Sequence, residues 1–224
     1  MKTPLSTQYN PRRGVTLVEF LVAFGIFIIL IGIAGGSFVR SVRVQRAALQ
    51  LMAVNDNMGI TIEQMMREVR TGYNFCTGAM PLTDPRFVGK CPDVTAGSSE
   101  LQFVTAGNVV TRYRLKGDAI QKGIVQSSWD PSNPVAVSCD VASGAEFDAV
   151  NGICYRNITA DNVKVTNVHF ETRYNNVGDG RSPRILISFE VTSNDPLVSS
   201  MTAPMTIQTT VSARCGETSC PSDM

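Results

Sequence analysis

The chain has 224 residues, is 43% hydrophobic and 17% charged, and carries a formal net charge of +1. That length suits one domain with an additional segment, or two small domains. The balanced charge gives no reason to expect a nucleic acid as partner. The only histidine, His169, leaves little room for a histidine-based metal site or catalytic triad, and we expect it to be an exposed strand residue. The sequence contains no nucleophile elbow, phosphate loop or HExxH motif, so an enzyme is not expected.

The N-terminal segment has the composition of a polar leader followed by a membrane helix. Residues 1–14 carry three positive charges and no negative charge, and residues 15–39 contain a single charged residue, Glu19. A helix over these 25 residues would be about 37 Å long, enough to cross the hydrocarbon core of a bilayer. Positive charges flank the segment equally on both sides, so the charge rule does not assign its orientation.

A secretory signal peptide is a competing interpretation of the same segment. The apolar stretch Phe20–Ile31 and the small residues Gly32 and Ala34 fit a cleavage point before Gly35. This interpretation gives Glu19 no role, although a carboxylate inside an apolar run costs about 2.5–3.5 kcal/mol at the centre of a span and less near an end. The exposed amides of the helix N-terminus make the charge tolerable there, but they do not explain its presence.

The segment Arg12–Leu21, with the sequence RRGVTLVEFL, resembles the prepilin processing site of type IV pilins and type II secretion pseudopilins. The family pattern is a basic residue and a glycine, then the cut, then an apolar residue, threonine, leucine and, two residues later, a glutamate. Gly14 matches the glycine before the cut, Val15 the new N-terminus and Glu19 the glutamate. The departure is Val15, where phenylalanine is commoner in the family.

The resemblance implies that a prepilin peptidase cuts after Gly14 on the cytoplasmic side of the bacterial inner membrane and methylates the amine of Val15. The hydrophobic helix then anchors a single-pass subunit, with its head outside the cytoplasm, until other subunits join it in a pilus or pseudopilus. Thr16 and Glu19 would be assembly residues. In a filament the Glu19 carboxylate would pair with the free amine of a neighbour's Val15, and such a pair is strongly favoured over either charge alone in a medium of low dielectric.

Helical character continues beyond the membrane segment. From Arg40 to Arg70 the chain has no proline and one glycine, and Gly72 is a plausible stop. We therefore predict one helix from Val15 to about Thr71, with residues 40–72 as its amphipathic continuation. Apolar residues at spacings of three, four and seven predict one buried stripe of Val42, Leu49, Met52, Ala53, Ile60, Met66 and Val69. The charged residues Arg67, Glu68 and Arg70 are predicted to form a solvent-exposed face.

Residues 73–224 are predicted to form a β-rich head. Strand composition and turn signals predict a meander of three strands, Glu100–Thr105, Asn108–Leu115 and Asp118–Val125. The later predicted strands are Asn162–Tyr174, Arg184–Thr192 and Thr206–Arg214. In the second strand Arg112 and Arg114 alternate with apolar residues, and this alternation predicts that one face of the strand is basic. A long helix laid on an antiparallel sheet gives an α+β fold.

Six cysteines predict structural disulfides formed in an oxidising compartment. They are Cys76, Cys91, Cys139, Cys154, Cys215 and Cys220. Six cysteines allow fifteen connectivities, and the sequence does not choose among them. Pairing of nearest neighbours would close two spacings of 15 residues and one of five. Without a CxxC motif, no metal site is expected, although the segment Asn176–Gly180 fits either a plain hairpin turn or part of a calcium loop.

Within the pilin-like class, the strand pattern is similar to that of the minor subunits. The element Val109–Leu115 before a turn and the closing strand Thr209–Arg214 look like the J-type minor pseudopilin or its minor pilin counterpart. Two other classes stay open: a conventionally secreted β-rich binding protein, and a membrane-tethered receptor or adhesin that is neither cut nor assembled. The sequence does not separate secretion, DNA uptake, adhesion and motility.

Overall fold

The structure is a computed structural model that describes residues 14–78, 98–107, 109–125, 139, 145–148, 152–173, 182–200 and 203–214. The chain divides into two compact units, residues 1–46 and residues 47–224. Helix α1 (Leu17–Thr71) is continuous through the boundary between them. The prediction of one uninterrupted helix that ends before Gly72 is confirmed, and the helix begins two residues later than predicted.

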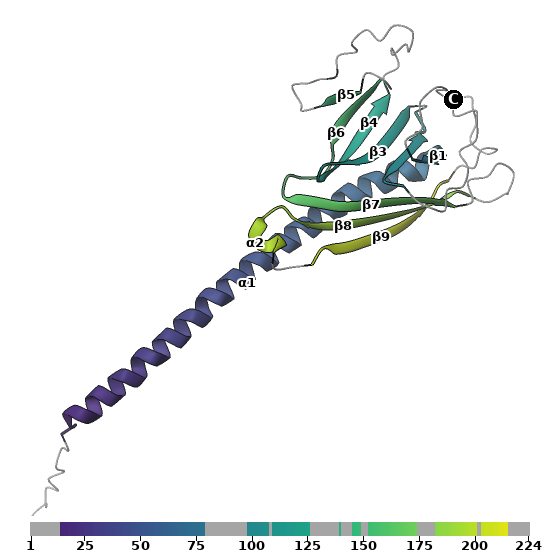
Figure 1. The fold of residues 1–224 in the computed structure, drawn as a ribbon. Helices are drawn as coiled ribbons and strands as arrows, with labels where there is room; N and C mark the ends of the chain where they lie inside the picture. Colours follow the sequence, from purple (N-terminus) through teal and green to yellow (C-terminus); the bar gives the residue numbers. More distant parts are fainter. Residues whose placement is uncertain are drawn as a thin grey trace, which may run out of the picture. The chain divides into compact units, whose positions relative to one another are not determined.

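The second unit contains two antiparallel sheets (Figure 1). The first sheet has the strand order β1-β2-β3-β4-β6-β5 and the second the order β7-β8-β9. A short helix, α2 (Pro196–Ser199), lies between β8 and β9 in the sequence. The strands are β1 (Tyr73–Thr77), β2 (Glu100–Val104), β3 (Val110–Lys116), β4 (Ala119–Val125), β5 (Glu146–Asp148), β6 (Ile153–Asn157), β7 (Val163–Arg173), β8 (Arg184–Ser193) and β9 (Met205–Ser212). The α+β fold with a long helix on antiparallel sheets is therefore confirmed.

The predicted meander corresponds to β2, β3 and β4, which pair with their sequence neighbours throughout. The three later predicted strands correspond to β7, β8 and β9 and form a sheet of their own. Three strands were not predicted. β5 has three residues, β6 has five, and β1 begins one residue beyond the end of the helix pattern. β5 is too short for alternation to reveal it, whereas β1 and β6 are as long as the predicted β2.

Residues 47–71 of α1 supply one side of the hydrophobic core. Val54, Met58, Met65 and Val69 are fully buried on the helix. Their partners in the core cluster come from both sheets and include Phe75, Leu101, Phe103, Tyr113, Ile120, Val165, Phe170, Ile185, Ile187 and Phe189. Both sheets therefore share one core with this part of the helix, as the arrangement of the ribbons also shows (Figure 1).

The predicted buried stripe of the helix is largely wrong. Leu49, Met52 and Ile60 are 66%, 62% and 67% exposed. Val69 is buried as predicted and Met66 is partly buried against the core, but the other buried residues of the helix are Ala47, Val54, Met58, Thr61, Ile62 and Met65. Part of the reason is Thr61, which is polar and yet buried, because its hydroxyl donates hydrogen bonds to the carbonyl oxygens of Asn57 and Ile158 at 3.0 and 3.2 Å. The helix is apolar on more than one face, and the sheets cover the face that contains this threonine.

Candidate processing and assembly site

The N-terminal end of α1 is built by Thr16, which caps the helix. The backbone N–H of Glu19 donates to Thr16 Oγ1 at 3.2 Å, and the N–H of Phe20 donates to the Thr16 carbonyl at 3.1 Å. A threonine hydroxyl at the N-cap satisfies one of the amides that a helix leaves unpaired at its start. Thr16 and Glu19 have the Thr-x-x-Glu spacing of a capping box. The sequence contains this local signal, which our sequence interpretation had not used.

Glu19 lies in the first turn of α1, where the partial positive charge of the helix end favours a carboxylate. Its side chain has no ion pair or hydrogen bond within the described residues; the contact that places it is the one made by its backbone N–H. Gly14 and Val15 precede the helix in the same exposed segment. A Cβ added to Gly14 would meet no atom within 4 Å, so the described fold itself does not demand a glycine there.

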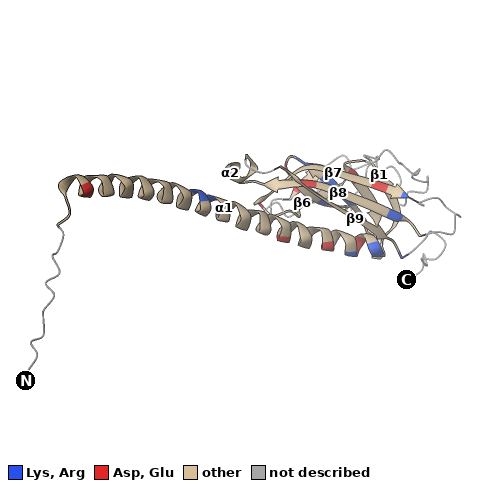
Figure 2. Ribbon diagram, turned by 90° about the horizontal axis from the view of Figure 1, so that it is seen from below, with Lys and Arg blue, Asp and Glu red and all other residues tan. Residues whose placement is uncertain are grey.

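The first unit presents an apolar surface along α1. Leu17, Phe20 and Phe27 are 75%, 63% and 57% exposed, and most of their large apolar neighbours are similarly exposed. Figure 2 shows that charged residues are almost absent from this part of the helix. Among the described residues, α1 is the one helix that is long and apolar enough to cross a membrane. Such a surface needs lipid or other apolar helices around it.

Residues 9–35 match the family described as the prokaryotic N-terminal methylation motif. The matched segment includes Gly14, Val15, Thr16 and Glu19 together with most of the apolar stretch. Comparison of the chain with curated proteins and with solved structures found no match. The motif supports a precursor of the type IV pilin-like class, whose members are structural proteins held in a membrane by an apolar N-terminal helix.

The prediction that Glu68 belongs to a solvent-exposed face is wrong. Its Oε2 accepts a hydrogen bond of 2.7 Å from the hydroxyl of Tyr113, and its Oε1 binds the ammonium of Lys122. The side chains of Glu68 and Lys122 are only 23% and 18% exposed, and Tyr113 is fully buried. Burial, together with the carboxylate of Glu68, raises the pKa of Tyr113 far above its usual value. By contrast, the neighbouring Arg67 is exposed, as predicted.

The basic face predicted for β3 is mostly enclosed. Arg112 is 5% exposed, and its guanidinium donates to Gln102 Oε1 at 2.9 and 2.6 Å. The guanidinium of Arg114 lies 3.4 Å from the centre of the Tyr155 ring, a cation–π contact. Burial raises the pKa of the Tyr155 hydroxyl, partly offset by the two arginines. The arginines are thus internal structural partners rather than an open surface for anions.

Glu146 sits at the margin of this group on the outermost strand, β5. Its carboxylate pairs with the ammonium of Lys116, and its Oε2 lies 3.4 Å from Arg114 Nη2. The hydrogen bond from Lys116 is the main cause that lowers the pKa of the Glu146 carboxyl. This pair joins the end of β3 to β5.

The cysteines give one defined disulfide, between Cys139 and Cys154, whose Cα atoms are 5.7 Å apart. This is one of the pairs of the nearest-neighbour pattern. Cys76 is also disulfide-bonded, and no cysteine among the described residues is free. Cys91, Cys215 and Cys220 lie outside the described residues. Cys154 belongs to β6, so the bridge fastens residue 139 to the edge region of the first sheet.

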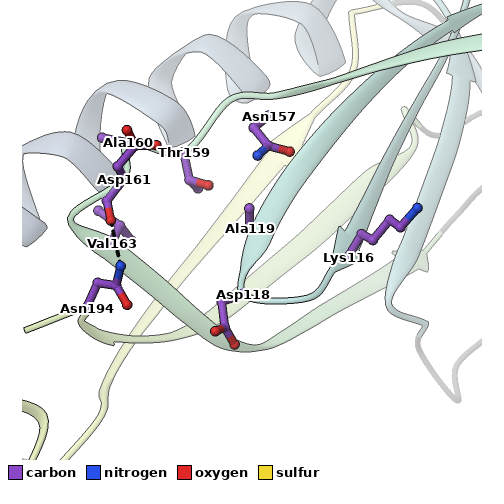
Figure 3. A pocket seen from close by; sticks show the side chains of 9 residues that line it. All are labelled: Lys116, Asp118, Ala119, Asn157, Thr159, Ala160, Asp161, Val163 and Asn194. Carbon is purple, nitrogen blue, oxygen red and sulfur yellow. Dashed lines mark hydrogen bonds between the residues drawn. The ribbon is translucent and has the colours of Figure 1, made fainter. Parts of the chain in front are cut away.

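A polar hollow of about 450 Å³ lies between the β3–β4 turn and the segment that connects β6 to β7. It is lined by Lys116, Asp118, Ala119, Asn157, Thr159, Ala160, Asp161, Val163 and Asn194 (Figure 3). Most of its polar groups are engaged with one another or with neighbours. The amide of Asn194 donates to the Asp161 carbonyl at 3.0 Å, and Asp118 pairs with Lys164 at 3.2 Å. We therefore assign the hollow no ligand.

Two further sequence predictions concern metal ions. In the part of the chain that the structure describes, no three acidic, histidine or cysteine residues form a group suited to a metal. The calcium-loop alternative at Asn176–Gly180 falls outside the described residues. His169 lies on a strand as predicted, on β7 opposite Ser188, but it is half-buried rather than exposed.

Proposed function

We propose that this protein is a minor pilin or minor pseudopilin, a structural subunit of a type IV pilus or a type II secretion pseudopilus. Residues 1–14 are the leader removed by a prepilin peptidase, residues 15–39 the transmembrane and assembly helix, residues 40–72 its amphipathic continuation, and residues 73–224 the disulfide-stapled head. The observation that carries the proposal is the methylation motif at residues 9–35, placed at the capped start of a long apolar helix.

Glu19 is the residue on which assembly depends. Its carboxylate lies in the first helical turn and has no side-chain partner among the described residues. Cleavage after Gly14 creates a free amine on Val15, and the amine of a neighbouring subunit supplies the missing positive charge. An ion pair formed between subunits in an apolar surrounding compensates for the cost of burying either charge. Processing and assembly are then chemically coupled. Because the described fold leaves space beside Gly14, the glycine serves the peptidase rather than the fold.

The partners are other pilin or pseudopilin subunits, the peptidase and the inner membrane. The head faces away from the cytoplasm, into a compartment in which its disulfide can form and persist. We assign the chain to the minor subunits, closest in strand pattern to the J-type, because of the meander followed by paired late strands. The competing secreted protein, cut before Gly35, would leave Glu19 and the methylation motif without a purpose. An uncut tethered adhesin would leave them equally unexplained.

The substitution Glu19→Gln tests the proposal in cells that assemble the filament. We expect the variant to be cleaved after Gly14 and to accumulate in the membrane. Its incorporation into sheared filaments should fall by about ten-fold or more, because one charge of a buried pair is lost. The matched control is Glu63→Gln, which removes a charge from the exposed part of α1, where Glu63 pairs with Arg67. Equal incorporation of Glu19→Gln and wild type would refute the assembly role.

A further inference from the structure

In the part of the chain that the structure describes, the two sheets have four edge strands, and β9 differs from the other three. Proteins usually protect a sheet edge by shortening it, charging it, bulging it or covering it, because unpaired main-chain groups invite another strand. β1 contains a bulge between Tyr73 and Cys76, with Asn74 at a φ of 55°. β5 has only three residues, of which Glu146 and Asp148 are acidic. These two edges of the first sheet are therefore blunted.

The far edge of the second sheet is protected as well. β7 contains a bulge between Val165 and Asn167, and a bridge from Ser98 to Phe170 occupies part of its outer side. The backbone N–H of Ser98 donates to the Phe170 carbonyl at 2.9 Å, and the Phe170 N–H donates back at 2.7 Å. β7 therefore does not offer a continuous row of main-chain groups.

β9 has none of these protections. Its eight residues, MTIQTTVS, include no charge, proline or glycine, and they pair with β8 from Met205 to Ser212 without interruption. Thr206, Gln208, Thr210 and Ser212 are exposed. In the described residues, no main-chain hydrogen bond of β9 goes anywhere but to β8. An edge of this length and regularity is a template for strand addition.

Near Ser212 the outer face next to this edge carries two arginines, whereas Glu190 lies opposite Thr206 at the other end of β9. A hollow of about 320 Å³ on it is lined by Arg173, Arg184, Leu186, Gln208 and Thr210. Arg184 is paired across the sheet with Ser212, the last and smallest exposed residue of β9. Both arginines have other partners, and Arg173 donates to Glu171 at 2.6 Å. A guanidinium has five N–H donors, however, so such partners do not use up its capacity.

We propose that β9 binds an extended segment of another protein by antiparallel or parallel strand addition. The bound segment places an acidic side chain on the outer face, where it interacts with Arg184 across Ser212. Side chains of an added strand alternate between the two faces, so one register brings every second side chain of the segment to the outer face and one of them beside this hollow. A second copy of β9 would bring no acid to the arginines, since MTIQTTVS is uncharged. This proposal does not depend on assembly of the chain into a filament.

The test uses full-length protein in detergent micelles and two fluorescent probes. The first probe is a blocked eight-residue peptide of alternating valine and threonine in which one central threonine is replaced by glutamate. The second has glutamine in place of the glutamate. We expect the acidic probe to bind more tightly than the neutral one, and to slow amide hydrogen exchange specifically in residues 205–212. Arg184→Gln should weaken its binding by about ten-fold, because a charge-assisted hydrogen bond is lost.

Two controls make the result specific. Arg184→Lys keeps the charge and should retain most of the affinity. Lys164→Gln removes a positive charge elsewhere on β7, where Lys164 pairs with Asp118, and should have no effect. The proposal is overturned if neither probe protects β9. It is also overturned if both probes bind equally, or if β9 is already protected in the free protein because copies associate through this edge.

Discussion

Tyr113 on β3 donates a hydrogen bond of 2.7 Å to Glu68 on α1, linking the last turns of the helix to the first sheet across 45 residues of sequence. The second oxygen of the same carboxylate is occupied by Lys122 of β4. One helical residue therefore satisfies a buried hydroxyl and a mostly buried ammonium. Nearby, the backbone N–H of Arg214, which follows β9, donates to the Arg70 carbonyl at 2.9 Å. The contacts of Glu68 and Arg70 therefore fasten the end of α1 to both sheets.

Removing the Glu68 carboxylate should destabilise the head. In Glu68→Ala, the Tyr113 hydroxyl and the Lys122 ammonium lose their partner, which costs about 1–3 kcal/mol for buried polar groups. In a protein of this size that corresponds to a decrease in the melting temperature of about 2–4 °C per kcal/mol. Thermal unfolding of the full chain in detergent, followed by circular dichroism, measures the change. Glu63→Ala is the control, because its exposed pair with Arg67 is worth no more than about 0.5 kcal/mol. Equal effects of the two variants would contradict this role of Glu68.

The raised pKa of Tyr113 predicts an alkaline limit to stability. A tyrosine whose pKa is higher in the folded than in the unfolded state contributes stability that is complete below the unfolded value, about 10, and declines as the pH rises through it. The melting temperature should therefore fall above about pH 10, and less steeply in Tyr113→Phe. Tyr155, whose pKa burial also raises, should contribute to the remaining slope. Identical slopes for Tyr113→Phe and wild type would argue against the shift.

Two glycines of the same helix region should respond to alanine in opposite directions. A Cβ on Gly72 would lie 2.5 Å from Phe103 Cδ2 and 3.1 Å from the Val104 carbonyl oxygen. Gly72→Ala should therefore cost about 1–3 kcal/mol of stability through overpacking. A Cβ on Gly59 meets nothing within 4 Å, and Gly59→Ala should stabilise the helix by about 0.5–1 kcal/mol. Denaturant unfolding of both variants provides the comparison. Equal changes in the free energy of unfolding would contradict the predicted contrast between the packed Gly72 and the open Gly59.

The sequence was sufficient for the elements whose signals are local and repeated. The end of α1 at Gly72, the meander of β2 to β4 and the strands β7 to β9 follow from periodicity and turn residues. The division of the strands into two sheets was not predicted, because it depends on which strands pair across long sequence separations. β6, for example, pairs with β4 despite the segment between them.

The helix shows where one-dimensional patterns fail. Leu49, Met52 and Ile60 have the right spacing for a buried stripe, but another face of the same helix is packed. Glu68 lies between two arginines in the sequence and looks like part of a solvated patch, and only the fold brings Tyr113 and Lys122 to it. At the candidate site the opposite holds. Gly14, Thr16 and Glu19 lie within six residues, so a short motif identifies them without knowledge of the head.

The disulfide between Cys139 and Cys154 should be found in protein extracted without reductant. Proteolysis under non-reducing conditions, followed by mass spectrometry, should yield a peptide pair joined through these two cysteines, and alkylation before reduction should label no cysteine. Closure of a loop of this length is worth about 3 kcal/mol in the chain-entropy model. A fragment that links Cys154 to any other cysteine, or labelling of two or more cysteines in the folded protein, would contradict the described pairing.

The N-terminal mass of the protein isolated from its native membrane tests the central claim most directly. Processing as a pilin-like precursor predicts a chain that begins at Val15 with one methyl group on its amine. A chain that begins at Gly35 would make the protein a conventionally secreted domain, and one that retains residues 1–14 would make it an uncut membrane protein. Either of these results would contradict the proposed assembly through Glu19.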